Sequence, residues 1–476
     1  MKHILGFAAI FAVFVFFARR EVFTWPYYYD EADYMFAASL GWANYTDQAS
    51  QSLSDYIRTG VNDGGDPARR SILSARSRGG ADPNFYRHWH GPLYFYWLSA
   101  LAPLHLDEPA TRSLSYIFPA LTALVIYFGS LWLFPAGVGG LAAVLSSAFY
   151  LWSYATVFSN EIAPHQLFVL CAVTALIFLM KWRATGEPRA WYGAVIASAC
   201  AFCTLEVAFV LVAVIAVCGF TQTANDRHRI GKSILAFLAT VLFLWPAALL
   251  KFSFAKAYLF MAYLALMRKS PWGDGGVFET WKLRLMQSPW EWLLLGLAVI
   301  LYLRFCDSAL RKMLLPVMLY GVLMLVVLLR VNSETPRYML PFLPAFQIGA
   351  GIIFASVLKN RKPALRFAAA AAILCLLFWN TYSQLRAHPI LPAPRLAEVI
   401  ARVRDQKLES HRLLAPQNDL PMIHYYLPGV MVSGYASERE RAVMLAQDNF
   451  DAVLYPGYPI SLQRQSSVSP HYLSQR

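Results

Sequence analysis

Charged side chains are scarce in this sequence. Asp, Glu, Lys and Arg make up 14% of the 476 residues, whereas 58% of the residues are hydrophobic and the mean hydropathy is +0.42. Soluble globular domains contain about 25% charged and about 45–50% apolar residues. The composition therefore excludes an ordinary soluble enzyme and indicates a membrane protein.

Cysteine is also rare, and none lies in the long hydrophilic segments, so disulfides do not hold those segments together. Cys200 and Cys203 have the spacing of a redox or zinc pair. They lie inside an apolar stretch with no second pair nearby, so we interpret them as packing residues. The six cysteines are Cys171, Cys200, Cys203, Cys218, Cys306 and Cys375.

Motifs for binding nucleotides are missing. Gly231-Lys232-Ser233 resembles the end of a phosphate-binding loop, but position 226 is Asp where that loop needs Gly. The sequence contains no His-Glu-x-x-His and no dinucleotide-binding glycine pattern. It also has no long hydrophilic segment on the side that we predict to be cytoplasmic. If the protein is an enzyme, it works on the outer face with an activated substrate other than ATP or a sugar nucleotide.

Long apolar segments dominate what is present. A helix that crosses a bilayer needs about 20 apolar residues. The first segment resembles a signal peptide, but Arg19-Arg20 is a poor cleavage site, so we interpret it as an anchor. We predict about 11 transmembrane helices, near residues 3–18, 112–134, 138–157, 165–182, 190–203, 205–221, 233–252, 291–306, 313–331, 339–357 and 364–382.

The basic residues predict an orientation. The formal net charge is +13, and the last segment, 383–476, contributes only +2 of it. With the N-terminus inside, the inner segments hold fourteen basic residues and the short outer loops hold four. Cytoplasmic loops of membrane proteins are rich in Lys and Arg. We therefore expect a multi-pass protein of a bacterial inner membrane with segments 19–111, 253–290 and 383–476 on the outer side.

This orientation divides the chain into two predicted domains. Residues 1–382 form an all-α polytopic membrane domain with large outer loops at 19–111 and 253–290. Residues 383–476 form a small α/β domain on the periplasmic face. Within it we expect strands at 412–416, 430–434 and 452–456, and helices at 420–426 and 437–447.

Three carboxylates follow the first apolar segment. Asp30, Glu31 and Asp33 lie directly after an aromatic run that ends at Tyr29. Crowded carboxylates at a membrane boundary repel one another, which suits one of them to accept a proton as a general base. The alternative is structural: Asp30 caps a surface helix, and Glu31 and Asp33 complement its dipole.

A second group of polar residues precedes the next apolar segment. Just before an expected helix lie Arg87, His88 and His90. Trp89 lies between the two histidines, and Tyr94 follows four residues after His90. Cations and N–H donors at a helix start suit a phosphate. The alternative is that Trp89 and the histidines only anchor the chain at the membrane interface.

Two further outer turns contain candidate residues. Glu161 and His165 end up near the same membrane face as Asp30, where they are either part of a site or merely solvated. Arg337 lies on that face too, next to Tyr338, as a second phosphate ligand or as an interfacial anchor.

Three motifs in order resemble those of a known group of enzymes. They are Asp30-Glu31 after the first apolar segment, His-Gly-Pro-Leu-Tyr-Phe-Tyr-Trp-Leu at 90–98, and Pro-Arg-Tyr-Met-Leu-Pro-Phe-Leu-Pro-Ala at 336–345. Together they resemble the GT-C superfold glycosyltransferases, specifically the bacterial relatives of protein O-mannosyltransferases and of the aminoarabinose lipid A transferase. The resemblance covers roughly residues 1–385. It implies an inverting transfer of a sugar from a polyprenyl-phosphate donor outside the membrane.

The resemblance also implies roles for individual residues. Asp30 matches the catalytic Asp of the family with Glu31 as its neighbour, and Glu161 lies near the second acidic position. His90 falls close to the lipid phosphate, and Arg337 matches the Arg of the late motif. There are two departures: Gly91 replaces a proline, and Thr204-Leu205-Glu206 stands where many relatives have Thr-Lys-Gly.

The reaction implied by the resemblance needs a base and a set of cations. Asp30 takes a proton from an acceptor hydroxyl, whose oxygen attacks the anomeric carbon, while cations balance the charge of the departing polyprenyl phosphate. The scheme requires no metal or other cofactor, but the carboxylate cluster leaves a divalent metal as an open alternative. The expected partners are the lipid-linked sugar, a lipid, glycan or protein acceptor, and membrane lipids, but not nucleic acid. We place Arg87, His88, His90 and Arg337 at the phosphate, and Tyr29, Asp33, Trp89, Tyr94, Glu161, His165 and Tyr338 around the substrates.

Two other functions are open at this point. A transporter or flippase of lipid-linked sugars places ionisable residues near the middle of the bilayer, and Glu206, in the middle of an apolar stretch, favours it. The gathering of most polar residues at one face favours an enzyme. An O-antigen ligase or polymerase also uses lipid-linked sugars but lacks the early Asp-Glu loop.

Overall fold

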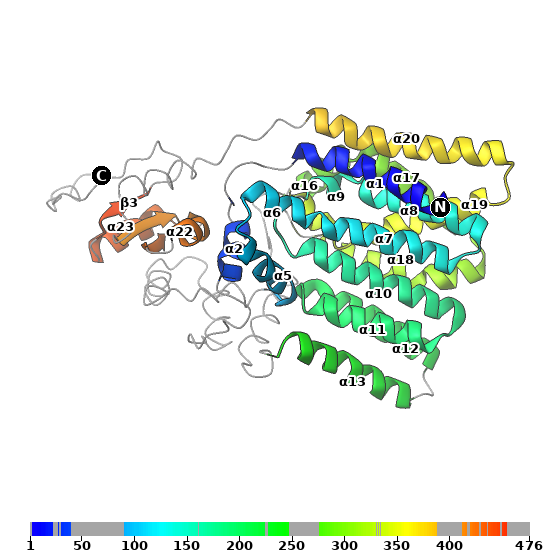
Figure 1. The fold of residues 1–476 in the computed structure, drawn as a ribbon, viewed down its shortest axis with the longest axis horizontal. Helices are drawn as coiled ribbons and strands as arrows, with labels where there is room; N and C mark the ends of the chain where they lie inside the picture. The colour runs from blue at the N-terminus through cyan, green and yellow to red at the C-terminus, as the bar shows by residue number, and fades with distance from the viewer. Residues whose placement is uncertain are drawn as a thin grey trace. The chain divides into compact units, whose positions relative to one another are not determined.

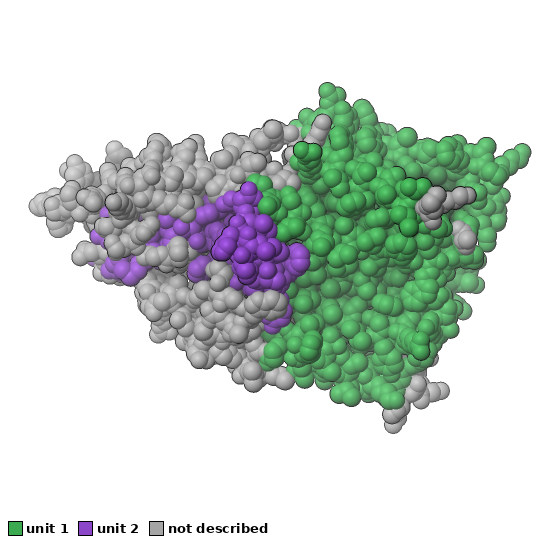
Figure 2. Space-filling view, in the orientation of Figure 1, with its two compact units in different colours: residues 1–23, 89–94, 109–390 green, residues 24–88, 95–108, 391–476 purple. Residues whose placement is uncertain are grey.

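The protein consists of two compact units, which are coloured separately in Figure 2. Unit 1 comprises residues 1–23, 89–94 and 109–390, and unit 2 comprises residues 24–88, 95–108 and 391–476. The computed structural model describes residues 2–21, 27, 30–39, 90–159, 161–223, 227–246, 276–329, 331, 333, 335–387, 412–416, 419–427, 430–435, 437–447 and 450–454.

Unit 1 is built from helices, which Figure 1 shows running roughly alongside one another. Their ends follow from local sequence. Gly186, with a φ of 72°, ends α10, and Pro188 begins α11 because proline suits the first helical turn. Asp307 caps α18 by accepting the Leu310 N–H at 2.7 Å. The helices are α1 (Lys2–Glu21), α6 (Glu108–Ser115, whose first residue belongs to unit 2), α7 (Ile117–Leu133), α8 (Ala136–Leu151), α9 (Tyr154–Val157), α10 (His165–Thr185), α11 (Pro188–Phe202), α12 (Phe209–Thr223), α13 (Arg227–Leu244), α16 (Val277–Gln287), α17 (Pro289–Phe305), α18 (Ser308–Leu328), α19 (Leu343–Leu358) and α20 (Pro363–Ala387), with 3-10 turns η3 (Glu206–Ala208) and η4 (Pro336–Met339).

The centre of unit 1 is the helix α8, which packs against α7 and α19. A Cβ atom at Gly351 of α19 would overlap Ser146 of α8, so only glycine allows these two helices to approach this closely. Next to them α10 packs against α7, α11 and α18, and α13 lies beside α11 (Figure 1). The buried apolar side chains between the helices form one continuous core, as expected for a membrane domain.

Each of the eleven predicted apolar segments contains a helix in the structure. Among the described residues, four helices are long and apolar enough to cross a membrane: Glu108–Leu133, His165–Thr185, Ser308–Leu328 and Pro363–Ala387. A fifth span is formed if α16 and α17, which meet at an angle of 94°, are counted together. The structure therefore supports a polytopic helical membrane protein, and the count of eleven spans stays a prediction.

Unit 2 contains a small parallel sheet. Its strands β1 (Arg412–Pro416), β2 (Met431–Tyr435) and β3 (Ala452–Val453) have the order β2-β1-β3, with Arg412 in register with Met431. The helices α22 (Leu420–Tyr426) and α23 (Glu438–Gln447) connect the strands in turn. These elements lie where we expected them. They group with the first long loop, however, so a separate domain 383–476 stays a prediction.

The other helices of unit 2 come from the first long loop. They are α2 (Asp30–Ser39), α5 (Leu93–Leu101), which the unit boundary cuts after residue 94, and the turn η2 (Ala102–Leu104). α2 packs against α22. Tyr27, just before α2, donates its backbone N–H to the Tyr426 hydroxyl at 2.6 Å, and that hydroxyl donates to Glu108 at 2.8 Å. α22 thus holds the start of α2.

Candidate active site

Not every predicted site residue can be placed. Tyr29, Arg87, His88 and Trp89 lie outside the described residues, and Asp33 is described only as part of the backbone of α2. The remaining candidates are distributed between the two units.

In unit 2 the predicted base lies at the start of a helix. Asp30 and Glu31 are the first two residues of α2, where the positive end of the helix dipole favours carboxylates. Glu31 is 4% exposed, whereas Asp30 is half-buried. The Ser99 hydroxyl donates to the Ala38 carbonyl at 3.0 Å and ties the other end of α2 to α5. Asp30 is therefore the more accessible carboxylate on a helix that is fixed at both ends.

In unit 1 two turns far apart in the sequence bring a histidine to a carboxylate. His90 Nδ1 lies 2.9 Å from Glu206 Oε2, and the two side chains are 14% and 6% exposed. The backbone sets this distance, since Leu93 N–H donates to the Cys203 carbonyl at 3.0 Å. A Cβ atom at Gly91 would overlap that same carbonyl, so glycine lets the turn 90–93 lie directly on the turn 203–206.

A second cation–carboxylate pair lies in the same unit. Arg337, in η4, donates from Nη1 to Glu161 Oε2 at 2.7 Å. Its guanidinium also lies 5.2 Å from the centre of the Tyr338 ring, close enough for a cation–π contact. Carboxylate, aromatic ring and guanidinium fix one another, which holds the arginine in a defined orientation.

His165 links the two pairs. It is the first residue of α10 and is 6% exposed, with its ring edge-on to Tyr338 at 5.7 Å between centres. It interacts electrostatically with both His90 and Arg337. Within the described part of the chain, no group forms a hydrogen bond to the buried Nδ1 of His165. Unit 1 therefore gathers three nitrogen-bearing side chains from three separate turns.

These positions can be compared with the predictions from sequence. Five of the predicted residues lie in one cluster: His90, Glu161, His165, Arg337 and Tyr338. We call these five residues and Glu206 the cation cluster. Tyr94 is fully buried, and its ring packs against Phe118 at 6.2 Å between centres. The sequence did not identify the partner of Glu206, although an acidic residue inside an apolar stretch signals that a partner must exist.

The chemistry of the cation cluster suits an anion. Guanidinium and imidazole groups in a largely buried setting bind phosphate through charge-assisted hydrogen bonds. Among the described residues, no three His, Cys, Asp or Glu side chains are grouped as ligands of a metal ion would be.

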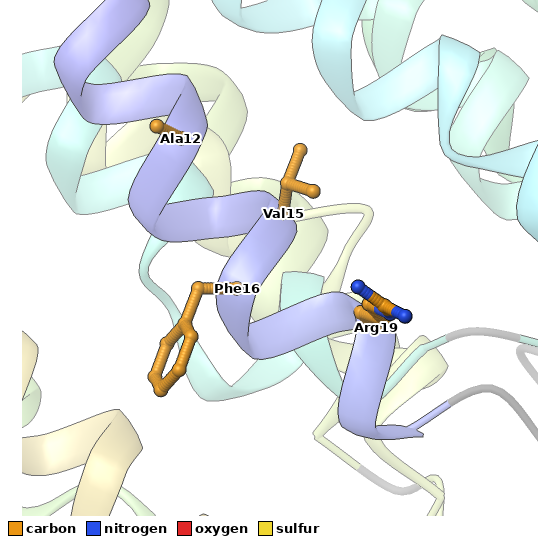
Figure 3. Close-up of a pocket in the computed structure, with 4 residues that line it drawn as sticks. All are labelled: Ala12, Val15, Phe16 and Arg19. Atoms are coloured by element: carbon orange, nitrogen blue, oxygen red, sulfur yellow. The ribbon is translucent and has the colours of Figure 1, made fainter.

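A groove also lies along α1, outside the cation cluster. It has a volume of about 510 Å³ and is lined by Ala12, Val15, Phe16 and Arg19 (Figure 3). Three of these residues are apolar and the fourth is a cation at the end of the helix that we predict to be outermost. Such a surface fits a lipid, but it contains none of the predicted site residues.

The comparisons with known proteins found similar folds among solved structures. No protein-family model matches the sequence, and no curated protein matches it. The structure is similar to that of ArnT from Cupriavidus metallidurans bound to undecaprenyl phosphate, with a TM-score of 0.57 and 13% identity over 93% of this chain and 88% of ArnT. This chain has the GT-C fold.

A second GT-C structure agrees with the first. The archaeal oligosaccharyltransferase AglB from Archaeoglobus fulgidus, in complex with an inhibitory peptide and a dolichol-phosphate, gives a TM-score of 0.57 and 12% identity over 92% of this chain. The match covers 64% of AglB, so this chain spans less than two thirds of that protein. The resemblance that we drew from three sequence motifs is confirmed at the level of the fold.

Proposed function

We propose that the protein is a membrane glycosyltransferase that moves a sugar from a polyprenyl-phosphate donor to an acceptor hydroxyl. Two membrane enzymes with this fold have been solved with lipid phosphates, undecaprenyl phosphate and dolichol-phosphate. The observation on which the proposal depends is the cation cluster, which brings His90, His165 and Arg337 together. The proposed reaction takes place on the outer face of a bacterial inner membrane.

The cation cluster binds the donor phosphate in this proposal. When the bond between the anomeric carbon and the phosphate oxygen breaks, both electrons leave with the phosphate, which gains a negative charge. The positive charge of Arg337 and ring N–H groups of the two histidines stabilise this charge. Little reorganisation is needed at Arg337 and His90, because Glu161 and Glu206 already hold them in place. Arg87 and His88 are proposed to contribute from the same stretch of chain as His90.

Asp30 is the proposed base. The acceptor oxygen attacks the anomeric carbon from the side opposite the phosphate, so the configuration inverts, and the hydroxyl proton passes to the Asp30 carboxylate. Asp30 suits this role better than Glu31 because it is the more exposed of the two. The scheme needs no metal. The other predicted residues are proposed to line the substrate pocket; they are Tyr29, Asp33, Trp89, Tyr94, Glu161, His165 and Tyr338.

The test is transfer of a labelled sugar. Membranes with wild-type protein or with the Asp30→Asn variant are incubated with labelled polyprenyl-phosphate sugars, and the labelled product is isolated. Because the amide cannot accept the proton, we expect the rate to fall by about 10²–10⁴-fold. Asp307→Asn is the matched control, because it makes the same chemical change at a helix cap on the side that we predict to be cytoplasmic, and it should retain activity.

Two results would contradict the proposal. Wild-type activity in Asp30→Asn would remove the base. Absence of transfer by the wild type, combined with movement of lipid-linked sugars across reconstituted vesicles, would support the transporter alternative. Glu206 was the residue in favour of a transporter, and its pairing with His90 now gives it a place beside the proposed phosphate site.

A further inference from the structure

Glu206 has no part in the transfer as described above. Its side chain is nonetheless almost fully buried in the middle of an apolar segment. Removing a carboxylate from water costs several kcal/mol unless a hydrogen-bonded partner compensates for it. Glu206 is the first residue of η3, the turn that joins α11 to α12, and the start of a helical turn favours an acid. The contact with His90 Nδ1 supplies the hydrogen-bonded partner that this buried carboxylate needs.

The two side chains meet in a fixed geometry. The turn 90–93 and the turn 203–206 are joined by the hydrogen bond from Leu93 N to the Cys203 carbonyl, and there is no room between them for a Cβ at Gly91. The Thr204 hydroxyl donates to the Cys200 carbonyl at 2.8 Å and ties the second turn to the end of α11. With both backbones held, the contact to Glu206 also sets the orientation of the imidazole ring.

A hydrogen bond to one ring nitrogen fixes the direction in which an imidazole ring faces. We propose that Glu206 is a positioning residue, whose contact with His90 Nδ1 orients the imidazole ring toward the donor phosphate. This inference rests on the proposed function, since it assigns the phosphate of a lipid donor to His90.

The rest of the cation cluster depends on the same orientation. His90 interacts electrostatically with His165, and His165 interacts with Arg337. A rotation of the His90 ring would therefore change its interaction with His165. Glu161 holds Arg337 at the other end, so a separate carboxylate holds each end of the cluster.

Binding of undecaprenyl phosphate tests this role without any sugar transfer. The full chain is purified in detergent, and its affinity for undecaprenyl phosphate is measured for the wild type, Glu206→Ala, Glu206→Gln, His90→Ala and the double variant Glu206→Ala/His90→Ala. Loss of one hydrogen bond to a charged group corresponds to about tenfold in affinity, so we expect about that loss in Glu206→Ala. Glu206→Gln should lose less, because its amide oxygen still accepts the Nδ1–H bond.

The double variant separates positioning from a direct contact. If Glu206 acts only through His90, the double variant binds no more weakly than His90→Ala alone. In transfer assays Glu206→Ala should raise the KM for the donor and leave the KM for the acceptor unchanged. Glu187→Gln, in the turn before α11, is the matched control and should bind as the wild type does.

Three results would overturn the proposal. They are wild-type affinity in Glu206→Ala, additive losses in the double variant, and failure of the wild type to bind undecaprenyl phosphate. The last result also contradicts the proposed function, whereas the first two leave that function standing. If Glu206→Ala does not fold, Glu206→Asp serves in its place, because the shorter side chain keeps the charge but does not reach His90. Wild-type affinity in Glu206→Asp would count equally against the proposal.

Discussion

Single residues decide whether the two turns of the cation cluster can meet. Gly91 lies against the backbone of Cys203, and a Cβ atom there would also come within 2.8 Å of Thr204 N. This backbone belongs to the turn between two helices and has little freedom to move. The side chain that is missing at position 91 is therefore as important for the site as the side chains of His90 and Glu206.

Gly91→Ala is expected to separate the turns. Overpacking of a close-packed site costs about 1–3 kcal/mol, so the melting temperature of the purified protein should fall and the affinity for undecaprenyl phosphate should fall with it. Gly137→Ala is the control, because a Cβ at Gly137 meets nothing within 4 Å. A Gly91→Ala variant that melts and binds like the wild type would show that the turns can separate without cost.

The sequence identified the members of the cation cluster by type but not by pairing. Charged and aromatic residues at the ends of apolar segments are visible in a single sequence, and His90, Glu161, His165 and Arg337 were found in this way. The contact between His90 and Glu206 joins positions 116 residues apart, and the contact between Arg337 and Glu161 joins positions 176 apart. Local patterns contain no information about which of these turns fold against each other.

At the scale of elements, composition was the strongest signal. A long apolar segment forms a helix because every backbone group must find a partner inside the bilayer, and all eleven predicted segments contain one. The sharp bend of 94° between α16 and α17 was not expected. Ser288 and Pro289 lie at this bend, but such a pair also begins many straight helices, so the sequence alone does not reveal the angle.

The start of α22 contains a group whose charge depends on pH. Burial raises the pKa of Asp419 from its ordinary 3.8 to about 6. The folded state therefore holds this proton more tightly than the unfolded state does. The contribution of Asp419 to stability is most favourable below about pH 4, declines as the pH rises to about 6, and is unfavourable above that.

Asp419→Asn should remove this dependence. We expect the variant to be more stable than the wild type at pH 7 and to differ little from it at pH 4, because the neutral amide resembles the protonated acid. Thermal unfolding of the full chain in detergent, measured between pH 4 and pH 8, tests this. Equal pH profiles for wild type and Asp419→Asn would rule out the effect.

At the scale of the whole molecule, the predicted orientation can be tested directly. In a variant without the six native cysteines, a single cysteine is placed at Glu438 in α23 or at Arg361 between α19 and α20, both of which are exposed. The excess of basic residues in the predicted inner segments predicts that a membrane-impermeant thiol reagent labels intact cells at position 438 and not at position 361. The opposite labelling would invert the topology and place the cation cluster on the cytoplasmic side.

The grouping of the chain into two units lies beyond what the sequence shows. Composition divides the chain at about residue 383, where the apolar segments end. The structure instead groups the C-terminal segment with the first long loop, through α22 on α2 and through the hydroxyl of Tyr426. These contacts join parts that lie on either side of the whole membrane region, and no periodicity in the sequence indicates them.

The bond from Tyr27 to Tyr426 has a consequence for biosynthesis, because it joins residues 399 positions apart. The ribosome delivers α22 only after every membrane helix of unit 1 has been made. Until then the helix that bears Asp30 lacks its support, so in the proposed mechanism a nascent or prematurely terminated chain enters the bilayer without its base. Synthesis of the chain as far as α22 thus becomes a checkpoint before the proposed transfer can begin.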